Sequence, residues 1–389
     1  MLASMRNHKT NGIDTTDVIV VGGGVIGLAV ARALSDQGIT NIIVVERSLP
    51  GREASHAAGG MLAAQAEANE NDVLFELSIS SRELYPQWAA ALLEETGIDV
   101  QLERTGTLYL AFTEEDEKES EQRLRWQSKK GLAVERLGRN AALELEPGIS
   151  KHLRSALRFP MDVQVDNRHL ITALVSSLSK RQIEIRKGTE VKSLRIEHGR
   201  IAGVETDSNT VLAPIVVVAT GAWSSFLTDP DSRVPPVRIE PVRGQMLCLG
   251  PADRIRHVLY SPRGYIVPRR SGQVLAGSTS EHVGFCKDVT GGGIHSIMTN
   301  AIEIAPDVIR KAPLIDSWAG LRPRAEDGLP VIGGCIDVEG LYFATGHYRN
   351  GILLAPLTGN LIAEQMTTGI APAMARSLSP DRFQAVSVS

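Results

Sequence analysis

A glycine fingerprint lies near the start of the chain. Gly22, Gly24 and Gly27 form the pattern G-x-G-x-x-G between a short apolar run and a run of small and aliphatic residues, and Glu46 follows shortly after. Gly22 permits a tight turn, Gly24 lets a pyrophosphate approach the backbone, and Gly27 lets a helix pack on a strand. The helix N-terminus adds free N–H groups and partial positive charge. The spacing predicts a dinucleotide site in which Glu46 accepts hydrogen bonds from ribose hydroxyls and disfavours NADP by repelling its 2′-phosphate.

The fingerprint alone does not choose between FAD and NAD, but the following segment does. Residues 55–64 (SHAAGGMLAA) are small, mostly apolar and glycine-bearing. Such a segment can run close past a bulky planar ring. An NAD dehydrogenase more often has a continuous Rossmann domain in which strands and helices alternate. The sequence therefore favours FAD.

The elements that must position this site recur along the chain. Residues 17–21, 26–35 and 41–46 read as a strand, a helix and a strand, and further buried strands are predicted at 214–220 and 341–345, the last followed by a helix over 351–366. Residues 242–280 instead alternate apolar and polar positions between turns, which predicts an antiparallel sheet. The expected fold class is α/β with an α+β insert: a Rossmann-like FAD-binding domain and a mostly antiparallel-sheet substrate domain.

Both domains are expected to be discontinuous in sequence. We assign residues 17–90, 151–225 and 318–372 to the FAD-binding domain and residues 91–150 and 226–317 to the substrate-binding domain. Residues 1–16 and 373–389 are expected to be tails.

Composition excludes several classes of protein. The 389 residues carry 41 basic and 45 acidic side chains, a net charge of -4, and only 4% aromatic residues. Without an excess of Lys and Arg or a stacking surface, a nucleic-acid partner is not expected. No signal peptide is visible and no apolar run reaches the roughly 18 residues of a membrane span, so the expected location is cytoplasmic, with no membrane association.

Cysteine and histidine spacing predicts no metal site. Cys248, Cys286 and Cys335 lie far apart, so neither a disulfide framework nor a zinc site is expected, and each is interpreted as a small buried residue. His56, His282 and His347 have no metal-ligand spacing. The chain also lacks a G-x-S-x-G elbow, so a hydrolase has no support.

Seven segments follow one another in an order typical of a known family: DVIVVGGGVIGLAVARAL, ASHAAGGMLA, GTLYL, VVVATGAWS, GYIVPRRSG, WAGLRPRAEDGLPVIG and GHYRNGILLAPLTG. Together they resemble the D-amino-acid oxidase superfamily of flavoenzymes, and within it they are most similar to the glycine oxidases of the thiamine pathway. The resemblance extends from Asp17 to about residue 370.

The resemblance implies FAD, bound non-covalently because no cysteine matches a segment that carries a covalent flavin linkage. It places the following residues at the cofactor: Gly22, Gly24, Val25, Ile26 and Gly27 at the pyrophosphate; Glu46 and Arg47 at the adenosine ribose; Val191 at the adenine; Ala54, Ser55, Gly59, Gly60 and Met61 along the flavin; and His347, Tyr348, Arg349, Asn350, Gly351, Ile352 and Leu353 in the loop against the ring.

Three further residues are expected to recognise the substrate and support catalysis. Arg322 pairs with the substrate carboxylate, Tyr265 adds a hydrogen bond to it, and Arg349 lies at the site, as the resemblance implies. These residue types suit the task because a guanidinium binds a carboxylate in a bidentate manner and a phenol donates one more bond. The helix after Arg349 is expected to point its N-terminus at the flavin pyrimidine ring and stabilise negative charge there. No general base is required if a neutral amine delivers hydride directly.

Two positions depart from the family pattern. Arg263 stands where a histidine can occur near the site, and Ser280 stands where Met or an aliphatic residue can occur. Both would make the pocket more polar. The alternative is that Arg263 belongs, with Arg269 and Arg270, to a solvent-facing basic strand.

The resemblance implies oxidative deamination of glycine, or of small amines such as sarcosine and D-alanine, by molecular oxygen, serving thiazole formation in thiamine biosynthesis. It also implies a homo-oligomer, specifically a homotetramer. Three alternatives stay open: an oxidase of sarcosine or another N-substituted amino acid, a quinone-linked D-amino acid dehydrogenase of the same fold, and a non-catalytic FAD-binding partner.

Overall fold

The computed structural model describes residues 14–227, 237–252 and 254–383. The outer parts of the two expected tails, 1–13 and 384–389, lie outside these ranges. The inner parts belong to the fold. Asp14–Thr15 forms strand β1, and residues 373–383 form the 3₁₀ helices η2 (Ala373–Leu378) and η3 (Pro380–Phe383), in which Leu378 is fully buried.

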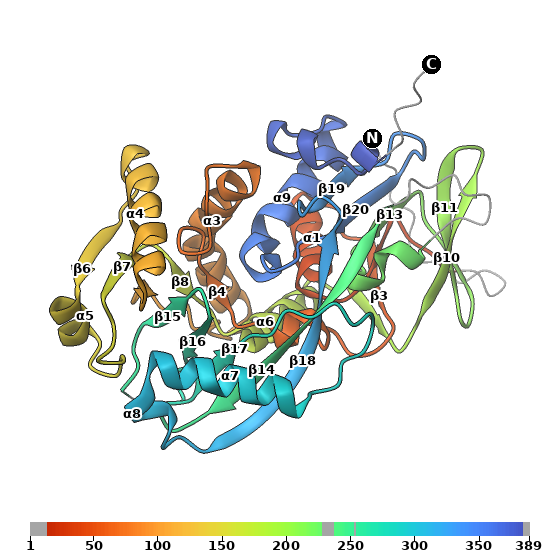
Figure 1. Cartoon of the computed structure of the whole chain (residues 1–389). Coiled ribbons are helices and arrows are strands. Elements are labelled where there is room, and N and C mark those ends of the chain that lie inside the picture. The colour runs from red at the N-terminus through yellow and green to blue at the C-terminus, as the bar shows by residue number, and fades with distance from the viewer. Residues whose placement is uncertain (1–13, 228–236, 253, 384–389) are drawn as a thin grey trace.

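A six-stranded sheet, built from segments throughout the chain, forms the centre of one half of the molecule (Figure 1). Its pairs are parallel except for the antiparallel pair β19–β20. The Val and Ile residues of β2 are all buried, as expected for a parallel strand covered on both faces. The strand order is β19 (Val331–Gly334), β20 (Leu341–Thr345), β13 (Ile215–Val218), β2 (Val18–Val21), β3 (Ile42–Glu46) and β9 (Glu184–Lys187).

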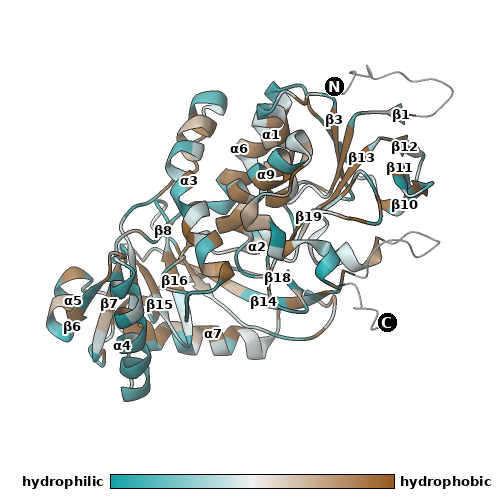
Figure 2. Cartoon of the chain, turned by 90° about the horizontal axis from the view of Figure 1, so that it is seen from above, coloured by the Kyte–Doolittle hydropathy of each residue, from teal (hydrophilic) through white to brown (hydrophobic). Residues whose placement is uncertain are grey.

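Different layers cover the two faces of this sheet. Val18, Val20 and Val44 pack against helices, which are α1 (Val25–Asp36), α3 (Val73–Thr96), α6 (Asn167–Lys180) and α9 (Gly351–Thr368). Ile19 and Val45 pack instead against a small sheet of β1, β12 (Thr210–Leu212), β11 (Arg200–Thr206) and β10 (Val191–Glu197). Figure 2 shows the resulting apolar centre along α1, α9, β3 and β13. The predicted βαβ unit, the strand near 214–220 and the C-terminal helix are confirmed.

An eight-stranded, mostly antiparallel sheet forms the centre of the other half of the molecule. Its order is β18 (Leu314–Ala325), β14 (Ile239–Leu249), β17 (Val274–Gly277), β16 (Gly264–Pro268), β15 (Val258–Ser261), β5 (Thr107–Ala111), β7 (Ser155–Phe159) and β6 (Glu135–Gly138). Helix α7 (Gly291–Ile304), with α8 (Pro306–Ile309), packs along β14, β16 and β17 (Figure 1). Helices α4 (Glu114–Lys129) and α5 (Arg139–Leu145) lie at the β6 and β7 end.

Strand pairing differs from the expected domain boundaries at two places. Residues 155–159 and 318–325 were assigned to the FAD-binding domain, but they form β7 and the second half of β18, which pair with β5 and β14 in the eight-stranded sheet. The reason is that an apolar run predicts a strand without indicating its partner. The remaining elements, α2 (Ala54–Ala57), η1 (Gly221–Phe226) and the short pair β4 (Met61–Leu62) with β8 (Val163–Gln164), connect the two sheets. Within the described ranges no helix is long and apolar enough to cross a membrane.

Candidate functional site

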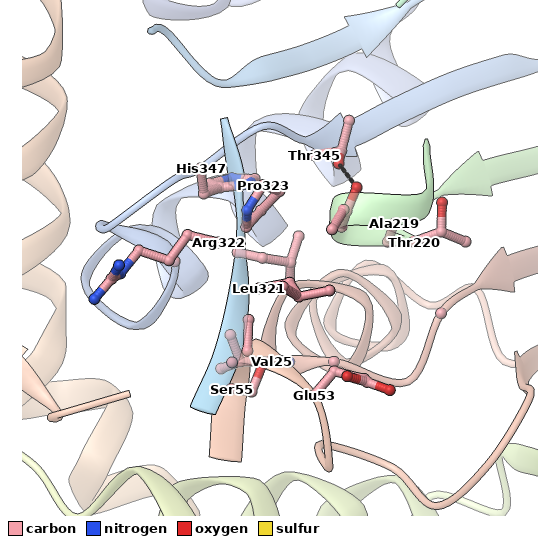
Figure 3. Close-up of a pocket in the computed structure, with 18 of the residues that line it drawn as sticks. Val25, Glu53, Ser55, Ala219, Thr220, Leu321, Arg322, Pro323, Thr345 and His347 are labelled. Carbon is pink, nitrogen blue, oxygen red and sulfur yellow. Dashed lines mark hydrogen bonds between the residues drawn. The ribbon is translucent and has the colours of Figure 1, made fainter. Parts of the chain in front are cut away.

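One elongated pocket contains most of the residues that the sequence predicted for the cofactor and the substrate. It begins beyond the carboxyl ends of β2, β3 and β13, where open α/β sheets bind ligands, and it reaches the face of the eight-stranded sheet. In Figure 3, Val25 and Ser55 line one wall, while Arg322 extends from β18 away from Thr220 and Thr345. The predicted residues that line the pocket are Gly22, Gly24, Val25, Ile26, Glu46, Arg47, Ala54, Ser55, Gly59, Gly60, Met61, Val191, Tyr265, Arg322, His347, Tyr348, Arg349, Asn350, Gly351 and Ile352.

The three fingerprint glycines have different surroundings. Gly22 adopts φ 109°, and a Cβ there would lie 2.4 Å from the Ala219 carbonyl oxygen. A Cβ at Gly27 would lie 2.0 Å from the Gly22 carbonyl oxygen. A Cβ at Gly24 would meet only the Ser55 hydroxyl, at 3.5 Å. Gly22 and Gly27 are therefore required by the protein's own packing, whereas Gly24 presents an open backbone surface to the pocket.

Glu46 organises the loop from the end of β3. Its carboxylate accepts hydrogen bonds from the Gly23 N–H at 2.8 Å and from the Ser48 N–H at 2.9 Å. The side chain is largely buried but still lines the pocket. These two bonds leave lone pairs that could accept from a ribose hydroxyl.

Two helices begin at the pocket wall. Neither Gly24 before α1 nor Asn350 before α9 caps its helix with a side chain, and neither first turn holds an acidic residue. At α1 the Val25 N–H donates to the Ser55 hydroxyl, at 3.0 Å. The positive ends of both helix dipoles thus face the pocket.

Arg322 presents a guanidinium that is paired only with neutral groups among the described residues. It donates to the Thr279 carbonyl oxygen at 3.1 Å and to the Ser278 hydroxyl at 2.8 Å. Burial lowers the pKa of Arg322, and nearby Arg349 adds to the lowering. A guanidinium in these surroundings is suited to bind an anion.

Gly244 lies directly beneath this guanidinium. A Cβ at Gly244 would lie 2.2 Å from Nη2 and 2.3 Å from Cζ of Arg322. The close approach follows from strand pairing, because Arg322 on β18 pairs with Val242, and Gly244 is its diagonal neighbour on the same face of the sheet. Gly244 therefore sets where the guanidinium can lie.

Tyr265 stands on β16 beside Arg322. Its hydroxyl donates to the Met246 sulfur at 3.2 Å, and its ring stacks with that of Tyr260 at a centroid distance of 6.4 Å. A Cβ at Gly59 would lie 3.4 Å from the Tyr265 ring. The phenol is consequently held by packing. Its hydrogen bond to a thioether is weak, so the hydroxyl could readily donate to a substrate instead.

Arg349 differs from Arg322 because it has a carboxylate partner. Its Nη2 lies 3.1 Å from Oε1 of Glu67, and its Nε lies 3.5 Å from Oε2. The Glu67 carboxylate is the main cause of the raised pKa of Arg349. Glu67 also lines the pocket.

His347 is a buried, neutral member of the pocket wall. Burial lowers its pKa to about 3, and its Nε2 lies 2.9 Å from the Thr358 hydroxyl. The imidazole therefore adds no positive charge near neutral pH.

Several predicted residues lie elsewhere. Leu353 is buried in the helical core rather than at the pocket, because α9 turns it inward. Arg263 pairs with Asp116 at 3.0 Å, outside the pocket lining, so it does not make the pocket more polar. Cys286 is exposed, unlike buried Cys248 and Cys335. Gly27 does not touch the pocket but packs the helix on the loop, as its predicted role requires.

Ser280, Arg269 and Arg270 are the remaining positions that the sequence assigned either to a more polar pocket or to a basic surface strand. Ser280 is exposed, with its hydroxyl 3.4 Å from that of Tyr348 in the pocket wall. Arg269 is not solvent-facing, since its guanidinium donates to the Gly59 carbonyl oxygen at 2.8 Å. Arg270 is exposed and pairs with Asp99 at 2.6 Å, as a basic surface strand would have it.

Sequence reasoning missed Glu67, Gly244, Ser278 and Thr279. None lies in a motif, and each matters only through a residue distant in the chain. The described residues hold no cluster of His, Cys, Asp and Glu that could bind a metal ion. The open backbone at Gly24, the starts of α1 and α9, whose N-cap residues provide no side-chain cap, and the Glu46 carboxylate fit a dinucleotide such as FAD.

Known proteins resemble the chain over nearly its whole length. A glycine oxidase from Geobacillus kaustophilus is 36% identical over 353 residues, which cover 90% of this chain and 92% of that protein. A bifunctional protein ThiO/ThiG from Trichormus variabilis is 35% identical over 356 residues, and the chain spans about half (52%) of its length. The crystal structure of the glycine oxidase from Geobacillus kaustophilus superimposes with a TM-score of 0.89 at 34% identity, covering 95% of this chain and 99% of that one.

The family model DAO, FAD dependent oxidoreductase, matches residues 17–365. That range contains the dinucleotide loop, Tyr265, Arg322 and the start of α9. The chain belongs to the DAO family of FAD-dependent oxidoreductases.

Proposed function

We propose that this protein oxidises glycine with FAD as cofactor and molecular oxygen as acceptor. The overall reaction is glycine + H₂O + O₂ → glyoxylate + NH₃ + H₂O₂. The observation that carries the proposal is the Arg322 guanidinium, which lies beside Tyr265 in the pocket and has no carboxylate partner among the described residues. Relatives named glycine oxidase and ThiO/ThiG support glycine as substrate and thiazole formation in thiamine biosynthesis as the purpose.

The residues at the glycine-loop end of the pocket would hold FAD without a covalent bond. The loop backbone at Gly24 and the N-terminus of α1 would bind the pyrophosphate, and Glu46 would accept from the adenosine ribose. Bound FAD supplies a two-electron acceptor for the hydride lost from the substrate Cα. The N-terminus of α9 would stabilise negative charge that develops at its end of the pocket.

The substrate end would orient a small amino acid by its carboxylate. Arg322 would bind the carboxylate with two charge-assisted hydrogen bonds, and Tyr265 would exchange its Met246 acceptor for a carboxylate oxygen. Met61 and Gly59 line the adjoining wall, where they would limit the space for a side chain. With the carboxylate fixed and the amine neutral, loss of hydride from Cα needs no general base.

A peroxide assay across a matched series tests the proposal. We expect glycine and sarcosine to react well, D-alanine more weakly, and bulky D-amino acids poorly. Amines without a carboxylate should be inactive, because they would leave the Arg322 guanidinium unpaired. Equal turnover of benzylamine and glycine would contradict the carboxylate clamp. Turnover of glycine with a quinone acceptor but without peroxide would replace the oxidase with a dehydrogenase.

A second measurement addresses the cofactor linkage. Acid precipitation should release the yellow flavin into the supernatant. Colour that stays with the precipitated protein would instead indicate a covalent linkage.

The proposed setting is a homotetramer in the cytoplasm. The free thiols of Cys248, Cys286 and Cys335 support a reducing compartment. Light scattering on the flavin-loaded protein would measure the oligomeric state, and a monomer or dimer at micromolar concentration would contradict the tetramer.

A further inference from the structure

The substrate end of the pocket contains two guanidinium groups with different partners. Arg322 donates only to a carbonyl oxygen and a hydroxyl among the described residues, whereas Arg349 faces both oxygens of the Glu67 carboxylate. The two arginines are close enough to interact electrostatically, since Arg349 contributes to the lowered pKa of Arg322. This end of the pocket therefore carries about one net positive charge rather than two.

We propose that Glu67 is a specificity-determining residue that restricts the site to substrates with a single carboxylate. By neutralising Arg349, Glu67 leaves Arg322 as the one guanidinium free to bind an anion among the described pocket residues. A substrate with a second carboxylate would bring that charge toward Glu67 and would have to compete with it for Arg349. Like charges in a partly buried site repel strongly, so the pair discriminates against dicarboxylates. This inference rests on the proposed function, because it takes a carboxylate to be what Arg322 binds.

The backbone at Glu67 is held in place, which limits how far the carboxylate can move from Arg349. The fully buried Asp162 carboxylate accepts from the Gln65 N–H at 3.0 Å and from the Ala66 N–H at 2.7 Å. Arg82 completes this anchor, with its Nη1 2.5 Å from Oδ1 of Asp162. The Glu67 N–H then donates to the Ala63 carbonyl oxygen at 3.1 Å. The main chain of Glu67 is thus anchored independently of the ion pair that its side chain makes.

Binding of two unreactive anions tests the proposal on the flavin-loaded protein. Methoxyacetate carries one carboxylate, and diglycolate is the same ether with a second one. The ratio of their dissociation constants can be measured from the change in the visible flavin spectrum. In the unaltered protein we expect methoxyacetate to bind more tightly. In Glu67→Gln, the freed Arg349 should improve diglycolate relative to methoxyacetate by at least about tenfold.

Two further variants separate charge selection from structural damage. Arg349→Gln leaves the Glu67 carboxylate without its partner, so the ratio should move at least about tenfold in the opposite direction. Adding Arg349→Gln to Glu67→Gln should remove the gain in diglycolate binding. Glu135→Gln is a matched control, since it removes a carboxylate from a distant ion pair with Arg158 and should leave the ratio unchanged.

The outcomes distinguish this proposal from the proposed function. An unchanged binding ratio in either Glu67→Gln or Arg349→Gln would overturn the role of Glu67, even if glycine is oxidised normally. If glycine is not oxidised but the ratios shift as expected, the proposed function fails and the charge selection stands. With the function intact, Glu67→Gln should also raise kcat/KM for iminodiacetate relative to that for glycine.

Discussion

At the dinucleotide end of the pocket, the fingerprint glycines and Glu46 lie close together in the chain, whereas the groups around Arg322 come from β14, β16, β18 and several distant loops. Gly22, Gly24 and Gly27 act through their backbone, and their contacts are mostly with each other and with neighbouring strands. Arg322 depends on Gly244 beneath it and on Thr279 beside it. The dinucleotide end is a backbone surface formed by a single turn. At the Arg322 end, residues from several strands together position one charged group.

This difference predicts different failures. A side chain added at the dinucleotide end meets main-chain atoms, as at Gly22 and Gly27, or enters the space of the pyrophosphate, as at Gly24, so it damages either the fold or cofactor binding. A side chain added at the Arg322 end meets the tip of a long side chain, which can shift. It should therefore alter substrate binding while the protein stays folded.

Gly27→Ala should have the largest effect. Its Cβ would lie 2.0 Å from the Gly22 carbonyl oxygen, so α1 cannot pack on the loop, and we expect a loss of at least about 4 kcal/mol of folding free energy. Gly24→Ala is the matched comparison, because its Cβ would make only an ordinary contact of 3.5 Å with the Ser55 hydroxyl. Thermal unfolding and FAD titration of both variants measure the contrast.

For Gly24→Ala we expect the apoprotein to unfold near the unaltered temperature but to bind FAD about 10- to 100-fold more weakly. Full FAD occupancy in this variant would show that the pyrophosphate does not approach the backbone at Gly24. A well-folded Gly27→Ala protein would remove the distinction between the two glycines.

Arg322→Ala should lower kcat/KM for glycine by roughly 30- to 1000-fold, since it removes a charge-assisted pair of about 2–4 kcal/mol from a partly buried site. FAD content should be unchanged, because Arg322 lies at the other end of the pocket. Arg322→Lys should recover only part of the loss, because an ammonium lacks the planar fork. Unaltered kcat/KM in the alanine variant would exclude Arg322 from substrate recognition.

Gly244→Ala should act on the same step without touching the substrate. The new methyl group would displace the Arg322 guanidinium, and we expect kcat/KM to fall about 10- to 100-fold, mainly through KM. Gly138→Ala is the control, because a Cβ there has no heavy atom within 4 Å. Steady-state kinetics and the unfolding temperature should separate misplacement from destabilisation. If both variants keep full activity, Gly244 does not position Arg322.

Glu281→Gln should have the smallest effect and depend on pH. Hydrogen bonds from Arg243, followed by those from Gln245 and Thr279, lower the pKa of Glu281 to about 2. The ionised carboxylate therefore stabilises the folded state above the unfolded pKa near 4.5, and this contribution is lost as pH falls toward 2. We expect a decrease in Tm of about 1–3 °C at pH 7, because the pair is partly exposed.

The Tm difference between Glu281→Gln and the unaltered protein should stay constant from pH 7 to 5 and narrow below pH 4.5. Differential scanning fluorimetry across this range measures it. A difference that widens on acidification would contradict the role of Glu281 as an ionised partner of Arg243. Because Thr279 also holds Arg322, a small rise in KM should accompany the change.

The sequence determined the dinucleotide end because the information there is local. The strand, the glycine turn and the helix follow one another directly, and Glu46 ends the next strand, so spacing alone brings Gly22, Gly24 and Glu46 to one pocket and Gly27 to the packing beneath it. The buried strands and the C-terminal helix were predictable for the same reason, since each is a continuous apolar segment. The family resemblance predicted that Tyr265, Arg322 and Arg349 belong to the site, but it did not predict their partners.

The contacts of each of these side chains follow from long-range strand pairing and packing. Strand register places Arg322 over Gly244, and the anchored segment after β4 places Glu67 against Arg349, although these partners are separated by 78 and 282 residues. The same applies to Arg263, which pairs with Asp116 outside the pocket, and to residues 318–325, which join the eight-stranded sheet. Such contacts depend on which strands pair and on which face a side chain emerges, and a one-residue change of register would reverse the face. No local pattern of residues records that choice.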